Sequence, residues 1–208
     1  MTLIVIHNVI LFLFVDIPEI KSSLQTLAIG GYSFQNVIIF HLSSFNELTT
    51  LTIGGNSFNN KNGQFAIWNC SKLTTLSFGL NTFYYYISPF NVSKCDSLQS
   101  IVFEGHSFIN AISLALSELP QLETITLKEF AFQYATYLTL TNLHSLRTID
   151  IGTRALNDVQ YFTIKGAHIE SLLIVDNPEL LSVNIGDYAA YSVKDIVFES
   201  TSWTGFFK

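Results

Sequence analysis

The amino-acid sequence predicts a β-rich repeat solenoid with one curved parallel sheet of about eight or nine short strands, an extended or irregular outer wall and little helix. Three observations lead to this fold class. A phrase of eleven residues returns eight times at steps of 23 to 25 residues, apolar residues alternate within each copy, and an aromatic residue closes most copies. A fixed period in this range indicates a stack of similar coils that bury a continuous core between neighbours.

The start of each copy predicts a strand. The positions three and five residues after the first are apolar in every copy, so the apolar residues alternate with period two and one face is buried. The first residues of the eight copies are Leu24, Leu48, Leu73, Leu98, Leu122, Leu146, Ile169 and Val193.

An aromatic column follows each predicted strand, ten residues after the start of the copy. It contains Phe34, Phe58, Phe83, Phe108 and Phe132, followed by Leu156. The seventh copy breaks the column, because Leu180 stands one place late, and Trp203 restores it. We expect these side chains to stack along the solenoid and to bury large apolar areas.

The second half of each repeat predicts a short extended segment on the opposite wall. Two apolar residues are separated there by one other residue, and helical periodicity over three turns is weak. The pairs are Phe40 with Leu42, Phe65 with Ile67, Phe90 with Val92, Leu114 with Leu116, Leu138 with Leu140, and Phe162 with Ile164.

The repeated phrase, clearest from Leu48 to Phe58, resembles the conserved segment of the leucine-rich repeat family, and residues 24–208 fit its pattern. The resemblance implies a leucine-rich repeat solenoid of the repeat α/β class, whose ninth place normally carries an Asn that bonds to the backbone of a tight turn. Here the ninth place holds Asn56, Asn81 and Asn177, but also Tyr32, His106, Phe130, Arg154 and Thr201. The chain is therefore identified as a divergent member. The Gly after the strand and the Ser/Thr–Phe pairs are similar to the BspA-like surface antigens.

The whole chain, residues 1–208, is predicted to be one solenoid domain. Residues 1–23 are interpreted as a truncated first repeat, because Leu3 and Val5 fall in the strand columns, Asn8 in the Asn column and Ile10 in the Phe column. The rival interpretation is that the apolar stretch 9–15 belongs to a secretory signal, although no Lys or Arg precedes it. Residues 24–208 form eight repeats, the last one incomplete, and we expect a fragment of a longer array.

The low content of charged residues restricts the kinds of partner that the chain is expected to bind. Only 12% of the residues are charged and the formal net charge is −6, with no cluster of basic residues. Nucleic acid is therefore not expected as a partner, because phosphate binding needs a Lys/Arg footprint. No run of eighteen apolar residues occurs, so no membrane span is predicted. The compartment, cell-surface or cytoplasmic, stays open.

Residues with catalytic or metal-binding chemistry are scattered. The five histidines form no recognised motif, and no nucleophile elbow, dinucleotide-binding motif or P-loop occurs. We expect no enzyme activity, no cofactor and no metal. Cys70 and Cys95 fall in a core column, one repeat apart, where free Cys acts as a small apolar residue; a disulfide between them stays open. Glycosylation at the sequons of Asn69 and Asn91 also stays open.

One outward column of the predicted sheet is almost entirely Thr or Ser. It is either a stabilising ladder of β-branched residues or a polar recognition strip. The leucine-rich repeat resemblance implies that this face binds partners, so we predict a protein-interaction module such as an adhesin, a receptor ectodomain or an adaptor. The alternatives are an architectural spacer and, less favoured, an enzyme domain. The predicted contact residues are Glu104, Thr124, Thr126, Lys128, Thr148, Asp150, Ser171, Leu173 and Glu199.

Overall fold

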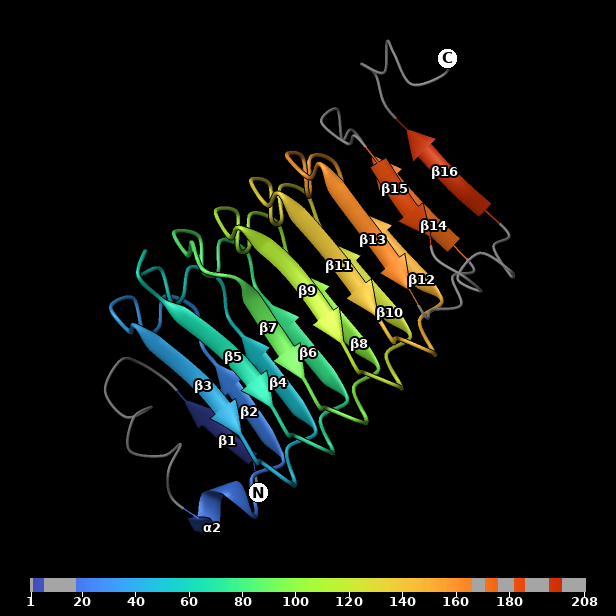
Figure 1. The fold of residues 1–208 in the computed structure, drawn as a ribbon. Coiled ribbons are helices and arrows are strands. Elements are labelled where there is room, and N and C mark those ends of the chain that lie inside the picture. Colours follow the sequence, from blue (N-terminus) through green and yellow to red (C-terminus); the bar gives the residue numbers. More distant parts are fainter. Residues whose placement is uncertain (1, 6–17, 166–170, 176–181, 186–194, 200–208) are drawn as a thin grey trace, which may run out of the picture.

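The computed structural model describes residues 2–5, 18–165, 171–175, 182–185 and 195–199, and the side chains of residues 18–160, 163 and 164. The chain winds as a parallel β-solenoid in which each repeat makes one coil (Figure 1). The predicted β-rich solenoid is confirmed. The prediction of little helix is confirmed too, since α2 (Pro18–Lys21) is the one α-helix in the described ranges.

The first wall is a nine-stranded parallel sheet, called sheet A, in the order β1-β2-β4-β6-β8-β10-β12-β14-β16. Neighbouring strands pair with a shift of one repeat, so that Leu51 lies between Leu27 and Leu76. The register of β1 against β2 pairs Leu3 with Leu27, as the repeat spacing predicts. The strands of sheet A are Thr2–Val5, Thr26–Ile29, Thr50–Ile53, Thr75–Phe78, Ser100–Phe103, Thr124–Leu127, Thr148–Ile151, Ser171–Val175 and Asp195–Glu199.

The outer wall corrects the expectation of a single sheet with an extended or irregular second side. It is a second parallel sheet, called sheet B, in the order β15-β13-β11-β9-β7-β5-β3. The apolar pairs predicted for this wall, from Phe40 with Leu42 to Leu138 with Leu140, face the core, as does Ile164. The backbone groups of these strands bond from coil to coil in the same register. From β3 to β15 the strands are Ile39–Ser43, Gln64–Trp68, Phe90–Ser93, Ser113–Ser117, Tyr137–Thr141, Tyr161–Lys165 and Ser182–Ile185.

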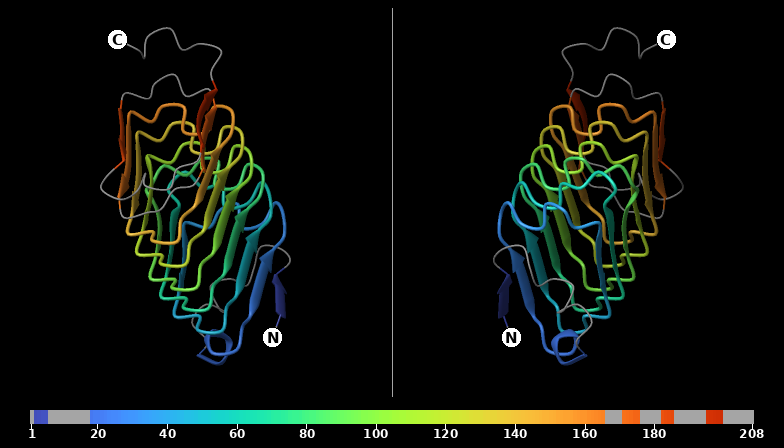
Figure 2. Two further views of the ribbon diagram at one scale, coloured as in Figure 1. Left: turned by 90° about the vertical axis from the view of Figure 1, so that its right-hand side faces the viewer. Right: turned by 90° about the vertical axis from the view of Figure 1, so that its left-hand side faces the viewer.

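A second sheet also removes the reason for the expected curvature. Coils bend when one wall is wider than the other, whereas neighbouring strands of both sheets lie about 4.8 Å apart. The described coils accordingly follow one another along a nearly straight line, and the two sheets face each other across the core in both side views (Figures 1 and 2). Asn8, Ile10, stretch 9–15, Leu180 and Trp203 lie outside the described residues.

The predicted aromatic column is confirmed as the centre of the core. Phe58, Phe83 and Phe108 are buried, and their rings stack with centroid separations of 4.9 and 4.6 Å and interplanar angles of 5° and 11°. Phe34 and Phe132 extend the stack at 5.2 Å on either side. Because each ring contacts the ring of the next coil, the column packs successive coils against one another.

The residue before each Phe explains the recurring Ser/Thr–Phe pair. Ser33, Ser57, Thr82 and Ser107 are fully buried polar side chains. The Ser57 hydroxyl accepts a hydrogen bond from the Ser33 N–H (3.1 Å) and donates one to the Gly30 carbonyl (3.2 Å). The hydroxyl column thus satisfies backbone groups that the turn would otherwise bury unpaired.

The turns use a left-handed backbone at non-glycine residues. Two columns after the sheet A strands from β2 to β12 and one after the sheet B strands from β3 to β11 have φ between 52° and 60°. One of these columns is the buried Phe stack itself, as at Phe83 with φ 55°. This conformation is unfavourable for most side chains. Ring stacking and coil-to-coil hydrogen bonds hold it in place here.

Candidate functional site

The predicted contact residues of sheet A are brought together in two rows. Thr124 and Thr126 on β10 lie directly beside Thr148 and Asp150 on β12, and all four side chains are partly buried. By backbone register, the rows continue through the predicted residues Ser171 and Leu173 of β14. The remaining predicted contact residue, Glu199, is the last residue of β16 and pairs with Val175 of β14. The described outward positions of β10 and β12 therefore carry three hydroxyl side chains and one carboxylate.

Two other predicted residues lie at the border of that face. Glu104 and Lys128 directly follow β8 and β10 and are exposed. Their backbone N–H groups still bond to the neighbouring coil, at 2.9 Å for Glu104 and 2.8 Å for Lys128. These two side chains belong to the connection between the sheets and do not stand in the rows of the sheet face.

That connection carries most of the exposed large apolar side chains that the structure describes. We call it the A-to-B edge, meaning residues 30–38, 54–63, 79–89, 104–112, 128–136 and 152–160. Among the side chains that the structure describes, ten large apolar ones are exposed, and seven lie in this edge: Tyr32, Ile38, Leu80, Tyr85, Ile87, Ile112 and Tyr134. Two more, Ile39 and Tyr137, are the first residues of the sheet B strands that follow. Nine of the ten therefore gather along one side of the stack, and Trp68 is the exception.

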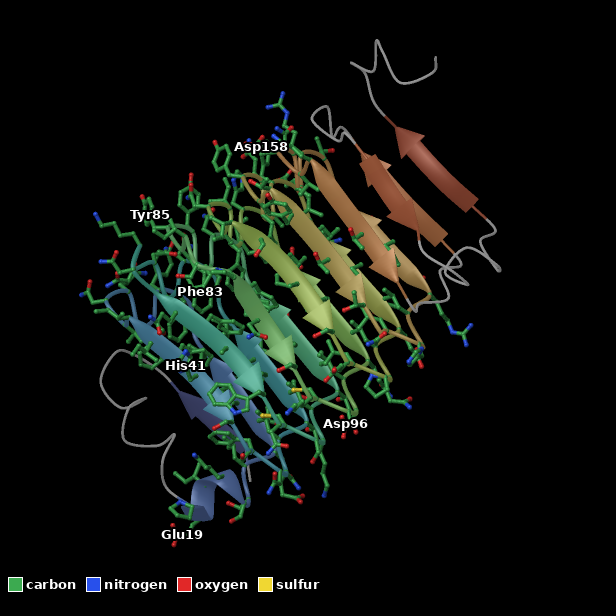
Figure 3. The ribbon with its side chains drawn as sticks, in the orientation of Figure 1. Glu19, His41, Phe83, Tyr85, Asp96 and Asp158 are labelled. Atoms are coloured by element: carbon green, nitrogen blue, oxygen red, sulfur yellow. The ribbon has the colours of Figure 1, made fainter. Side chains whose placement is uncertain are left out.

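The opposite connection is different in character. In the B-to-A edge, residues 44–49, 69–74, 94–99, 118–123 and 142–147, none of the ten exposed apolar side chains occurs. Lys72 and Glu47 form an exposed ion pair there at 2.7 Å. Asp96, Glu118, Asn142, His144 and Pro120 line an open hollow of about 350 Å³. Figure 3 shows Tyr85 and Asp158 at one edge of the stack and Asp96 at the other.

A ladder of side chains runs along the A-to-B edge at the ninth place of each repeat. The Asn81 amide donates to the Asn56 carbonyl oxygen at 3.2 Å. The His106 ring stacks on Phe130 with centroids 4.6 Å apart, and the Arg154 guanidinium lies 5.8 Å from the Phe130 centroid. Asn56 and Asn81 of adjacent coils thus bond to each other. At His106, Phe130 and Arg154, ring and cation contacts link the neighbouring coils instead.

Two tyrosines project from this edge in one column. Tyr85 and Tyr134 are 55% and 49% exposed and stand two coils apart, which is about 10 Å at the strand spacing. Asn110 holds the same place in the coil between them, and its amide donates to the Tyr84 carbonyl at 2.7 Å. The Tyr134 N–H bonds to the Ile109 carbonyl at 3.0 Å. The backbone under both rings is therefore fixed by neighbouring coils.

The charges of the edge balance. It contains the cations Lys61, Lys128 and Arg154 and the carboxylates Glu104, Glu129 and Asp158. The remaining residues include many Tyr, Asn and Gly, whereas Ser33, Ser57 and Ser107 of the edge are fully buried. Tyr, Asn and Gly are also enriched in antibody contact loops, in which Tyr supplies rigid contact area and Gly and Asn supply adaptable hydrogen bonds.

Of the predicted contact residues, only Glu104 and Lys128 lie in this edge, and the sequence analysis does not single out its exposed tyrosines. The signal was present in the column two places after each Phe, which reads Asn36, Asn60, Tyr85, Asn110, Tyr134 and Asp158. Because the other residues of this column are polar, its two tyrosines are expected to be exposed to solvent as well. The repeat pattern alone did not show that the connection faces solvent.

Comparison of the chain with protein-family models, with curated proteins and with solved structures finds no match. Within the part of the chain that the structure describes, no helix has the length and apolar character needed to cross a membrane. The same part holds no group of three or more His, Cys, Asp or Glu side chains placed to bind a metal ion.

Proposed function

We propose that this chain is a non-catalytic protein-recognition module, a divergent solenoid of the leucine-rich repeat type whose A-to-B edge contacts a protein partner. One observation carries the proposal: nine of the ten exposed large apolar side chains in the described part lie along this edge or directly after it. Exposed apolar groups are usual on protein surfaces when scattered, whereas their concentration on one side marks interaction sites.

The rigidity of the edge supports the same proposal. Binding costs free energy when side chains and loops must be ordered, so a surface that is already fixed binds more tightly for the same contacts. The connections of neighbouring coils are tied by backbone hydrogen bonds such as His106 N–H to Glu129 carbonyl and Phe130 N–H to Thr153 carbonyl, at 2.9 and 3.0 Å. The tyrosines stand on this fixed support.

The chemistry of the edge indicates the kind of partner. With balanced charges and exposed Tyr, Ile and Leu side chains, the edge offers apolar contact and neutral hydrogen bonds and has little electrostatic preference. A weakly charged protein surface with apolar groups is the matching partner. The assignment to the leucine-rich repeat family is supported by the repeated phrase and by one coil per repeat.

The test compares three variants of the full chain. An edge variant combines Tyr85→Ser and Tyr134→Ser. A face variant combines Thr126→Ala and Asp150→Ala on sheet A. The matched control is Trp68→Ser, because Trp68 is an exposed aromatic (38%) on the last position of β5, away from the edge. The partner is captured from an extract of the source cell, identified by mass spectrometry, purified, and titrated calorimetrically against each variant.

The proposal predicts that the edge variant binds the purified partner at least about tenfold more weakly, since buried Tyr side chains are common hot spots. The face variant and the Trp68 control should bind within about twofold of the unchanged chain. If the face variant loses affinity and the edge variant keeps it, the outer face of sheet A is the contact surface. If no protein binds saturably, the chain is an architectural spacer.

A further inference from the structure

The two cysteines of the chain occupy neighbouring positions in one buried column. Cys70 and Cys95 are both fully buried and both free. The strand residues before them are in register, with Ile67 beside Val92 and Trp68 beside Ser93. Cys70 stands three residues after Ile67, and Cys95 stands three residues after Val92. The two cysteines therefore occupy the same position in successive coils.

Hydrogen bonds fix that alignment up to the cysteines themselves. The Asn69 N–H, directly before Cys70, donates to the Ser93 carbonyl at 3.3 Å. The Cys95 thiol donates to the same carbonyl at 3.4 Å, and the Cys70 thiol donates to the Trp68 carbonyl at 3.6 Å. The two thiols therefore have equivalent orientations in one corner of the solenoid, one coil apart.

The separation of neighbouring coils suits a covalent bond. Strands of a sheet lie about 4.8 Å apart, which is inside the Cα–Cα range of about 4.4–6.8 Å found for disulfides. The column holds large apolar residues on either side, Phe45 before the pair and Leu119 after it, and both are buried. Two small side chains next to each other leave room for the sulfurs to approach.

We propose that Cys70 and Cys95 are a covalent modification site, at which an intrachain disulfide joins two successive coils of the solenoid. The bond closes a loop that contains Tyr84 and Tyr85 of the A-to-B edge. It adds a covalent link to a stack that is otherwise held by packing and hydrogen bonds.

The reaction requires an oxidant, which we take to be a small-molecule disulfide such as oxidised glutathione. The thiolate of one cysteine attacks the oxidant, forms a mixed disulfide and releases one glutathione thiolate. The second cysteine gives up its proton and attacks the sulfur of the first, forming the Cys70–Cys95 bond and releasing the second glutathione. Two thiols are oxidised and one glutathione disulfide is reduced to two thiols.

The thiols interact closely enough to affect each other's ionisation. The pKa of Cys70 is lowered, chiefly by the neighbouring Cys95 side chain, whereas the pKa of Cys95 is raised by the Cys70 side chain and by burial. The pair thus favours one thiolate over two. Because neither sulfur is accessible in the closed corner, exchange proceeds while the corner is open, during folding or local opening.

The test is oxidative refolding of the full chain in a mixture of reduced and oxidised glutathione. After unfolding and alkylation, the proposal predicts that neither cysteine carries the alkyl group and that digestion yields a peptide pair joined at Cys70 and Cys95. Oxidised chain should melt about 10 °C above reduced chain, because the bond restricts the unfolded state. The Cys70→Ala, Cys95→Ala double variant should melt at one temperature in both buffers.

Three results would overturn the proposal. They are alkylation of both cysteines after refolding, a disulfide that joins two chains, and an oxidised chain that melts at or below the reduced one. Since oxidised and reduced forms of the unchanged sequence are compared, the test stands even where the double variant folds poorly.

Discussion

Replacement of Phe83 by Ala removes one ring from the middle of the aromatic column. Phe83 is 2% exposed, and its ring is stacked between Phe58 at 4.9 Å and Phe108 at 4.6 Å. It also makes edge contacts with Phe65 at 5.2 Å and Tyr86 at 5.7 Å. The substitution leaves a cavity that neighbouring coils cannot fill, because their own spacing is set by the two sheets.

The expected loss of unfolding free energy is about 4–5 kcal/mol. A buried Phe→Ala change costs about 3–5 kcal/mol from lost transfer free energy and the cavity. Aromatic pairs contribute about 0.5–1.5 kcal/mol each beyond buried area. Two parallel stacks and three edge contacts are lost here, the third with Phe78 at 6.2 Å, which places the result in the upper part of that range. The left-handed backbone of Phe83 gives no compensation, since Ala is also unfavourable at φ 55°.

The assay is urea unfolding followed by circular dichroism. The matched control is Tyr85→Ala, which removes another aromatic ring from the same coil, but an exposed one. We expect the control to change the unfolding free energy by less than about 0.5 kcal/mol. A loss below about 1 kcal/mol for Phe83→Ala would refute the reasoning, because the column would then not be the core that holds successive coils together.

Two further perturbations test other parts of the account. Tyr86 is buried, its hydroxyl bonds to two backbone groups, and burial raises its pKa to about 12. The stability that it contributes is complete below pH 10 and is lost as the pH rises from 10 to about 12, so Tyr86→Phe should cost about 1–3 kcal/mol at neutral pH and flatten the alkaline fall of the melting temperature. Gly79→Ala places a Cβ 2.5 Å from a backbone nitrogen of the preceding coil and should cost about 1–3 kcal/mol in urea unfolding.

The controls for these variants are equally specific. Glu104→Ala changes the same column as Gly79 at a place that already carries a side chain, and it should be close to neutral. A neutral Gly79→Ala would show that successive turns do not approach as closely as described. An unchanged alkaline profile in Tyr86→Phe would show that this hydroxyl is not responsible for the pH dependence.

The part of the fold that was predictable comes from side chains that repeat. The strand columns of sheet A and the Phe stack alternate or recur at fixed places, so the apolar periodicity of the sequence predicts them. The sequence predicts the wall formed by sheet B only as extended or irregular. Two apolar residues such as Phe65 and Ile67 show which side of a short segment faces the core. The hydrogen bonds that join such segments into a sheet are made by backbone groups, which every residue carries, so the side chains do not reveal them.

The candidate site was predicted less well, for a related reason. The pattern identified the outward rows of sheet A, including Thr126 and Asp150, because the alternation of a strand defines both of its faces. Tyr85 and Tyr134 follow the strand in a turn without periodicity. Local propensity also argues against Phe at a left-handed position such as Phe83, so the path of this turn follows from coil-to-coil contacts.

The central claim, that residues one repeat apart lie directly above one another, is tested most directly by distances between spin labels. The experiment uses a chain with Cys70→Ala and Cys95→Ala, in which one label is always at His144. The second label is at Asp96, Ser71 or Asn46, which lie two, three and four coils away. All four residues are exposed and stand in one column of the B-to-A edge. Dipolar electron paramagnetic resonance should give mean distances that rise by about 4.8 Å per coil, to about 10, 14 and 19 Å for separations of two, three and four coils. Distances that fail to rise in equal steps would contradict the one-repeat, one-coil winding.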